Sequence, residues 1–142
     1  MRVALGADHA GFELKQTLRT FIEQLGHEVR DLGTDSVDSV DYPDFAKAVA
    51  ELVAEGGADV GLLVCGTGLG MAIAANKVTG IRAATCSEPY SAAMARAHND
   101  ANVLTIGSRV VGRGLAEETV ARFLETGFEG GRHQGRVNKL AN

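Results

Sequence analysis

The sequence lacks most features that mark secreted or nucleic-acid-binding proteins. It holds two cysteines and no tryptophan among 142 residues, and its net charge is -4. A deficit of basic residues disfavours nucleic-acid binding, because such affinity depends on neutralising phosphates. The sequence has only two cysteines, Cys65 and Cys86, and we see no basic segment followed by an apolar one that would act as a secretion signal. Both features disfavour a secreted protein held together by disulfides. We therefore expect a cytoplasmic protein with no nucleic-acid partner.

The sequence also lacks an apolar run long enough to cross a membrane. The uncharged stretch over residues 60–76 falls short of the ~20 apolar residues that a spanning helix needs. It also contains four glycines, Gly61, Gly66, Gly68 and Gly70. A buried strand followed by a loop fits this stretch better, and we expect no membrane partner.

Length and composition indicate one folding unit. A chain of 142 residues that is 45% hydrophobic can bury about two thirds of its unfolded surface around one core. We find no internal repeat and no interdomain linker. We therefore expect a single domain over residues 1–142, which ends in a glycine-punctuated basic tail over about residues 127–142.

Short apolar strands alternate with amphipathic helical segments. Strands are expected at Arg2–Gly6, Glu28–Leu32, Val60–Val64, Ile81–Cys86 and Asn102–Ile106. Helices are expected at Leu14–Leu25, Pro43–Glu55 and Leu69–Lys77, then from Ser87, and at Leu115–Thr126. The third strand is apolar at almost every position, which is typical of a central strand covered on both faces. This order predicts a three-layer, Rossmann-like α/β/α sandwich around a five-stranded parallel sheet with right-handed crossovers.

Reactive side chains follow three of the predicted strands. Asp8 and His9 follow the first strand, Cys65–Gly70 follows the third, and Ser108 and Arg109 follow the fifth. Because parallel strands end at one edge of a sheet, we expect an acid, an imidazole, a thiol and a guanidinium to converge there. For Asp8 the alternative is a helix N-cap with no further role.

The loop Cys65–Gly70 has the character of an anion-binding turn. Its glycines can direct several backbone N–H groups toward one point above the next helix, a setting that also activates a thiol. The spacing G-x-G-x-G differs from a dinucleotide fingerprint, and no Gly-Lys-Ser/Thr follows to make a Walker loop. We favour a reactive Cys65 over a packed one, whereas Cys86 fits packing. Thr67 contacts a substrate or merely caps the helix.

Two further polar groups lie outside this edge. His98 and Asn99 end a helix before the fifth strand, at the amino edge of the sheet, so they could reach Cys65 only from a partner subunit. The alternative is a polar helix end on the surface. Arg132 and Arg136 lie four positions apart and could clamp a phosphate from one helical face, or form a solvated basic end.

The histidines give no sign of a metal site. His9, His27, His98 and His133 are scattered and lack the short spacings of common metal-binding motifs. We expect no metal and no other cofactor.

Six short motifs in order make the chain resemble type B ribose-5-phosphate isomerases almost from end to end. These motifs are Gly6–Gly11, Cys65–Gly70, Ser87–Tyr90, His98–Asp100, Gly107–Arg109 and Gly131–His133. The resemblance implies interconversion of ribose 5-phosphate and ribulose 5-phosphate through an enediolate, within pentose phosphate metabolism. It also implies a homodimer with shared active sites, with a tetramer as the alternative assembly. A related subgroup has a glutamate where this chain has Met71, so this chain resembles the cysteine subgroup.

The same resemblance implies roles for individual residues. Cys65 would accept the proton, and His98 of a neighbouring subunit would open the sugar ring. Asp8 would bind sugar hydroxyls, and the enediolate oxygen would be surrounded by Gly66, Thr67, Gly68, Leu69 and Gly70, with Asp8 and Thr67 also counted as catalytic. Asn99 would contact the substrate. The sugar hydroxyls or the phosphate would be contacted by His9, Arg109, Arg132 and Arg136. Gly135 departs from some relatives, which have a bulkier residue there.

Two alternatives remain at this point. One is an isomerase of another sugar phosphate, such as allose 6-phosphate, galactose 6-phosphate or a tetrose 4-phosphate, with pocket length set by residues such as His9, Tyr42 and Leu69. The other is a noncatalytic phosphate- or nucleotide-binding module, in which Cys65 is only a packing residue. The roles of His9, Tyr42 and His133 are not individually assigned.

Overall fold

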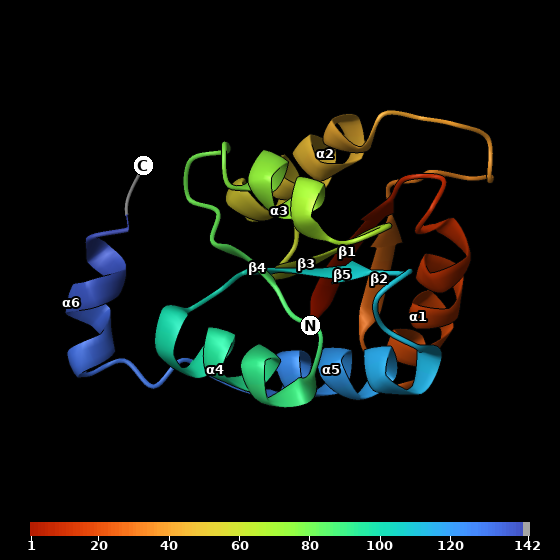
Figure 1. The fold of residues 1–142 in the computed structure, drawn as a ribbon. Coiled ribbons are helices and arrows are strands. Elements are labelled where there is room, and N and C mark those ends of the chain that lie inside the picture. The colour runs from red at the N-terminus through yellow and green to blue at the C-terminus, as the bar shows by residue number, and fades with distance from the viewer. Residues whose placement is uncertain (141–142) are drawn as a thin grey trace.

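Five parallel strands form one sheet at the centre of the molecule in a computed structural model that describes residues 1–140 (Figure 1). The strands are β1 (Arg2–Ala7), β2 (Glu28–Asp31), β3 (Val60–Cys65), β4 (Ala83–Thr85) and β5 (Val103–Gly107). The helices are α1 (Phe12–Gln24), α2 (Tyr42–Ala54), α3 (Leu69–Ala75), α4 (Pro89–Asn99), α5 (Arg113–Glu125) and α6 (Arg132–Asn138). The strand order is β2-β1-β3-β5-β4, and every neighbouring pair is parallel. The predicted α/β sandwich is confirmed.

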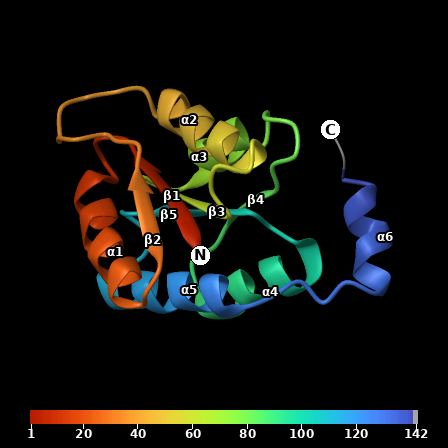
Figure 2. The ribbon, with the colours of Figure 1, turned by 180° about the vertical axis from the view of Figure 1, so that it is seen from behind.

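Helices cover both faces of the sheet, and β3 supplies side chains to both sides. Figure 2 shows α1, α4 and α5 on one face and α2 and α3 on the other. Along β3, Leu62 and Val64 pack into the core beneath α1, α4 and α5, whereas Leu63 and Cys65 pack beneath α2 and α3. All six residues of β3 are buried, which explains the continuous apolar run of the central strand.

Several element boundaries differ from the sequence-based expectation. The fourth strand is shorter than expected, because only Ala83–Thr85 pairs with β5. The helix that follows has Glu88 as its N-cap rather than Ser87, and the Glu88 carboxylate accepts the Ser91 N–H at 2.9 Å. Leu25, expected on the buried face of the first helix, is its C-cap and is 46% exposed.

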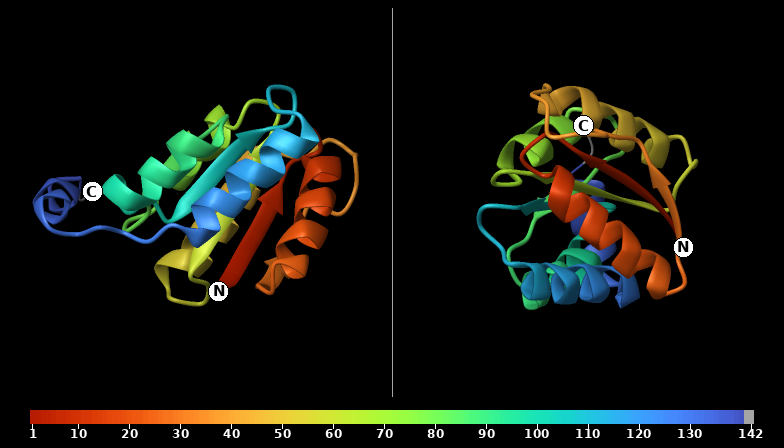
Figure 3. Two further views of the ribbon diagram at one scale, coloured as in Figure 1. Left: turned by 90° about the horizontal axis from the view of Figure 1, so that it is seen from below. Right: turned by 90° about the vertical axis from the view of Figure 1, so that its right-hand side faces the viewer.

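The basic tail contains a helix that stands away from the sheet. Figure 3 shows α6 beyond the end of α4, joined to α5 by an extended segment. Gly130 and Gly131, just before α6, both have positive φ angles, which glycine adopts without strain. The predicted tail also includes residues 141–142, which lie outside the described part of the chain.

Across residues 1–140, none of the helices combines the length and apolar character that a membrane crossing requires.

Candidate active site

Three loops meet at the carboxyl edge of the sheet and are joined by backbone hydrogen bonds. The Ser108 N–H donates to the Cys65 carbonyl at 2.8 Å, and the Arg109 N–H donates to the Gly66 carbonyl at 3.0 Å. From the loop after β1, the Asp8 N–H donates to the Val64 carbonyl at 3.2 Å. The expected convergence of these three segments is therefore present within one subunit.

The Cys65 sulfur lies at the start of α3 and contacts a backbone amide. Cys65 is only 6% exposed, and its Sγ accepts the Gly68 N–H at 3.1 Å. Gly68 has a φ of 82°, and a Cβ there would lie 3.0–3.2 Å from the Ile106–Gly107 backbone. Only glycine fits both conditions, so the turn that directs this amide at the sulfur depends on Gly68.

The second cysteine is in a different environment. Burial raises the pKa of Cys86 to about 11, and the nearby Glu88 carboxylate adds to this rise. A thiol with this pKa stays protonated near neutral pH. Cys86 packs in the core between the sheet and the α1, α4 and α5 layer, which agrees with the interpretation of a packing residue.

Thr67 and Asp8 both make local structural contacts. The Thr67 hydroxyl accepts the Leu69 N–H at 3.3 Å and so caps the first turn of α3. Asp8 is buried, and its Oδ1 accepts the Gly11 N–H at 3.0 Å. The N-cap of α1 is Gly11, so the alternative of Asp8 as the helix N-cap is wrong. Asp8 Oδ2 has no hydrogen-bond partner in residues 1–140. Every fully buried side-chain oxygen in these residues has a partner, so Oδ2 must be reached by solvent. A further contact is therefore open to Asp8.

His9 and Arg109 flank the Cys65 loop. His9 Nδ1 accepts the Val40 N–H at 3.2 Å, so a neutral His9 carries its proton on Nε2. This bond also connects His9 to the long loop before α2. The Arg109 guanidinium lies over Gly66, since a Cβ on Gly66 would be 3.1 Å from Nη1. The Arg109 side chain is exposed, with no acidic partner in the described chain.

The Tyr42 ring lies against the first turn of α3. A Cβ on Gly70 would lie 2.6–3.1 Å from ring atoms of Tyr42, so the Tyr42 ring lies directly against Gly70. Tyr42 and Leu69 are both exposed beside this contact. These two side chains can therefore limit the space beside the Cys65 loop.

His98 and Asn99 lie at the opposite edge of the sheet from Cys65. In the pairing of β3 with β5, Gly61 lies beside Val103 and Cys65 lies beside Gly107. The end of α4 precedes the Val103 end of β5, whereas Cys65 lies at the Gly107 end. Arg132 and Arg136 are exposed on α6, which contacts α4, so they also lie away from Cys65. A single subunit does not bring these four residues to Cys65.

The structure reveals a polar cluster around His98 that the sequence did not indicate. The imidazole rings of His98 and His133 are stacked, with centroids 4.3 Å apart and planes 12° apart. Glu129 Oε1 lies 3.4 Å from His133 Nε2 and 3.8 Å from His98 Nε2. These three groups have the chemistry of metal ligands and lie within 4.8 Å of one another. As placed, the rings are nearly parallel, so one ion could not lie in both ring planes.

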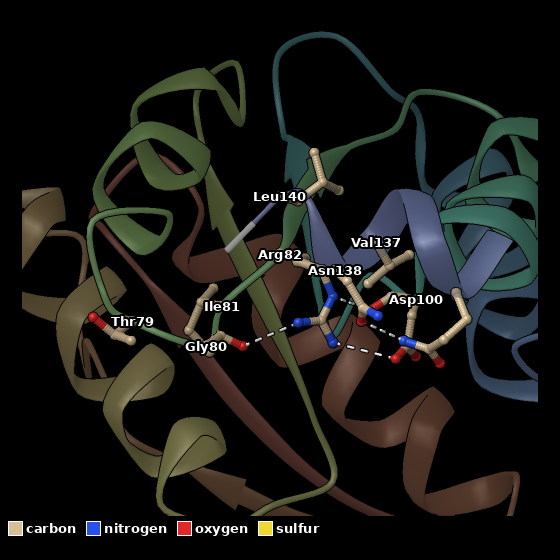
Figure 4. A pocket seen from close by; sticks show the side chains of 9 residues that line it. Thr79, Gly80, Ile81, Arg82, Asp100, Val137, Asn138 and Leu140 are labelled. Atoms are coloured by element: carbon tan, nitrogen blue, oxygen red, sulfur yellow. Dashed lines mark hydrogen bonds and ion pairs between the residues drawn. The ribbon is translucent and has the colours of Figure 1, made fainter. Parts of the chain in front are cut away.

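A well-formed hollow lies beneath α6, away from the Cys65 loop. It has a volume of about 540 Å³ and lies between α6 and the segment 79–82, where Arg82 pairs with Asp100 at 3.3 Å (Figure 4). A smaller hollow of about 410 Å³ adjoins the carboxyl edge and is lined in part by Ala10, Ser108 and Arg109. The reactive side chains around Cys65 and the hollow beneath α6 thus occupy different parts of the subunit.

Comparison with known proteins agrees with the sequence motifs. Residues 3–140 match the family described as ribose/galactose isomerase. The chain is 52% identical to ribose-5-phosphate isomerase B of Escherichia coli (strain K12), over 98% of this chain and 93% of that protein. It is 43% identical to D-erythrulose-4-phosphate isomerase of Pectobacterium atrosepticum, over 99% and 93%.

A solved structure shows the same fold. The structure of Clostridium thermocellum ribose-5-phosphate isomerase B aligns with a TM-score of 0.97 at 52% identity, over 99% of this chain and 95% of that one. The resemblance to type B ribose-5-phosphate isomerases is thereby confirmed. The protein is an isomerase and belongs to the ribose/galactose isomerase family.

Proposed function

We propose that this protein interconverts ribose 5-phosphate and ribulose 5-phosphate, with Cys65 as the base. The observation that carries this proposal is the Cys65 sulfur held at 3.1 Å by the Gly68 amide, where the Asp8, Cys65 and Arg109 loops meet. Isomerisation requires a base beside the reacting carbon and donors for a developing negative charge. This edge offers both within one subunit.

In the proposed reaction the Cys65 thiolate removes the proton from C2 of the open-chain aldose. The aldehyde oxygen takes up charge, and the backbone N–H groups of Gly66–Gly70 stabilise it as the enediolate forms. Asp8 Oδ2 and the Thr67 hydroxyl relay the proton from the C2 hydroxyl to O1, the former aldehyde oxygen, and C1 then receives the proton held by the Cys65 thiol. No electrons leave the substrate, so the reaction needs no oxidant and no cofactor.

The remaining residues would come from a second copy of the chain. His98 and Asn99 lie at the far edge of their own sheet, which supports their use in the site of a partner subunit. Arg132 and Arg136 are exposed with no acidic partner within the described residues, as a phosphate clamp would require. The hollow beneath α6 offers a place for the partner. We propose a single-domain chain that forms a cytoplasmic homodimer with shared active sites.

A second candidate is an isomerase of another sugar phosphate. One relative with 43% identity is named D-erythrulose-4-phosphate isomerase, so substrates differ among similar chains. Tyr42 and Leu69, exposed beside the Cys65 loop, are placed to limit substrate length. Pocket length rather than chemistry would then determine the preferred sugar.

Turnover measurements on ribose 5-phosphate, allose 6-phosphate, galactose 6-phosphate and erythrulose 4-phosphate test the proposed substrate. We expect the highest kcat/KM on ribose 5-phosphate, and a loss of about 100-fold or more in Cys65→Ala, in line with typical general-base contributions. Binding measured by thermal shift should be retained in Cys65→Ala. Binding without turnover in the wild type would instead support a noncatalytic module.

A further inference from the structure

The His98 ring stacks on the largely buried ring of His133 in the same subunit. The His98 side chain ends α4 and is 40% exposed, whereas the side chain of His133 is 10% exposed. Because the two rings stack at 4.3 Å, the face of His133 fixes the plane in which the His98 imidazole lies. The stack leaves the rotation of His98 within that plane to be set by another group.

Glu129 is the charged group placed to set this rotation. Its Oε1 lies 3.8 Å from Nε2 of His98 and 3.4 Å from Nε2 of His133. The Glu129 N–H donates to the carbonyl of Ala97 at 3.0 Å, which fixes the Glu129 backbone beside the turn that carries His98. The other nearby carboxylate, Asp100, already pairs with Arg82 and Arg96. Glu129 is therefore a carboxylate that His98 shares with His133 and that pairs with no arginine in residues 1–140.

We propose that Glu129 is a positioning residue, which draws Nε2 of His98 toward itself and turns Nδ1 outward to the substrate in the partner's site. Within residues 1–140, Nδ1 of His98 has no hydrogen-bond partner, so it is available to a group outside the subunit. This inference rests on the proposed function. In ring opening the C1–O4 bond of the furanose breaks, O1 loses its proton, and O4 gains one, with His98 transferring the proton.

The two substrates differ in their need for this step. Ribose 5-phosphate is mostly a closed furanose, whereas ribulose 5-phosphate is open-chain, because its O5 is esterified and cannot close a five-membered ring onto C2. A misplaced His98 therefore slows net conversion in both directions, because the equilibrium constant fixes the ratio of the two kcat/KM values, but it leaves enediolate formation from open-chain ribulose 5-phosphate intact. Exchange of the C1 hydrogen of ribulose 5-phosphate with D2O reports that step alone. A general disturbance of the fold would lower both rates together.

The test compares Glu129→Gln and Glu129→Ala with the control Glu125→Gln, which alters an exposed carboxylate on α5 that pairs with Arg122. For the Glu129 variants we expect kcat/KM for net conversion of ribose 5-phosphate to fall about tenfold or more, and the rate of C1 hydrogen exchange of ribulose 5-phosphate with D2O to fall less than about twofold, as for other orienting partners. His98→Asn should show the same asymmetry more strongly, and the control should match the wild type.

Equal losses in net conversion and in C1 hydrogen exchange would show that Glu129 acts only on the fold, and unchanged kinetics would show that it does not position His98. Either result would overturn the inference. If the wild type turned over neither pentose phosphate, the proposed function would fail instead, so the two failures are distinguishable.

Discussion

Cys65 and Cys86 carry the same side chain in different surroundings, and the surroundings determine what each can do. Both are buried, yet Cys65 ends the central strand at an amide-rich turn, whereas Cys86 lies in an apolar core with a carboxylate nearby. Burial and a neighbouring negative charge both disfavour a thiolate at Cys86. Local polarity, rather than exposure, separates the proposed base from the packing residue.

Alkylation of Cys86 tests this difference. A raised thiol pKa means less thiolate at a given pH, and iodoacetamide reacts with the thiolate. In Cys65→Ser we therefore expect slow labelling of folded protein at pH 8 and faster labelling only as the pH approaches the pKa of about 11. Mass spectrometry measures the rate, with urea-unfolded protein as the control. Rapid labelling of the folded protein at pH 8 would contradict the assigned environment.

The residues of the Cys65 loop could be predicted from sequence because they are neighbours in the chain and follow one strand. The alternatives foreseen for Asp8 and Thr67 have different outcomes: Thr67 bonds the first amide of α3, whereas the N-cap of α1 is Gly11 rather than Asp8. Glu129 could not be predicted, because its contact with His98 depends on how the tail folds back onto α4. A lone glutamate in a glycine-rich segment gives no local signal of such a partner.

A buried ion pair joins α1 to β2 and the loop that follows. Lys15 is 1% exposed, and its Nζ lies 2.7 Å from both carboxylate oxygens of Asp31. Asp31 Oδ1 also accepts the Gly33 N–H at 2.9 Å, at the start of the loop that reaches His9 through Val40. The pair therefore supports both the helix packing and the path of this loop.

Removing one charge of this pair should cost far more stability than removing the other. Asp31→Asn leaves the buried Lys15 ammonium without a full countercharge, and we expect the free energy of unfolding to fall by about 3–5 kcal/mol. Lys15→Met should cost less, since Asp31 keeps Arg19 at 3.4 Å and the Gly33 amide. Urea unfolding measures both. Asp59→Asn, at the exposed pair with Arg2, is the control and should change stability little.

Elements with strong periodicity were predicted closely, and marginal ones were not. The buried central strand and the second helix agree with their expected ranges to within about one residue. The fourth strand was predicted too long because its apolar ends, Ile81 and Cys86, are buried but lie outside the paired register of Ala83–Thr85, although the Cys86 N–H still donates to the Thr105 carbonyl at 3.1 Å. Burial alone makes a residue apolar, so composition could not separate these positions from a true strand.

Over the whole molecule, the two halves of the proposed chemistry lie at opposite edges of one sheet. The register of β3 and β5 keeps Cys65 and His98 apart within a subunit, and α6 carries its arginines away from the Cys65 loop. The sequence predicted this separation from element order alone. It could not show the hollow beneath α6 or the stacked histidines, because these depend on where the tail helix packs.

Mixing two inactive variants tests the shared active site most directly. Cys65→Ala and His98→Asn should each lose turnover of ribose 5-phosphate. After unfolding and refolding as an equal mixture, half of the dimers should be hybrids, each with one site that has both Cys65 and His98. In a two-fold dimer this restores about a quarter of wild-type activity. If the mixture stayed as inactive as its components while forming hybrids by native mass spectrometry, the shared site would be contradicted.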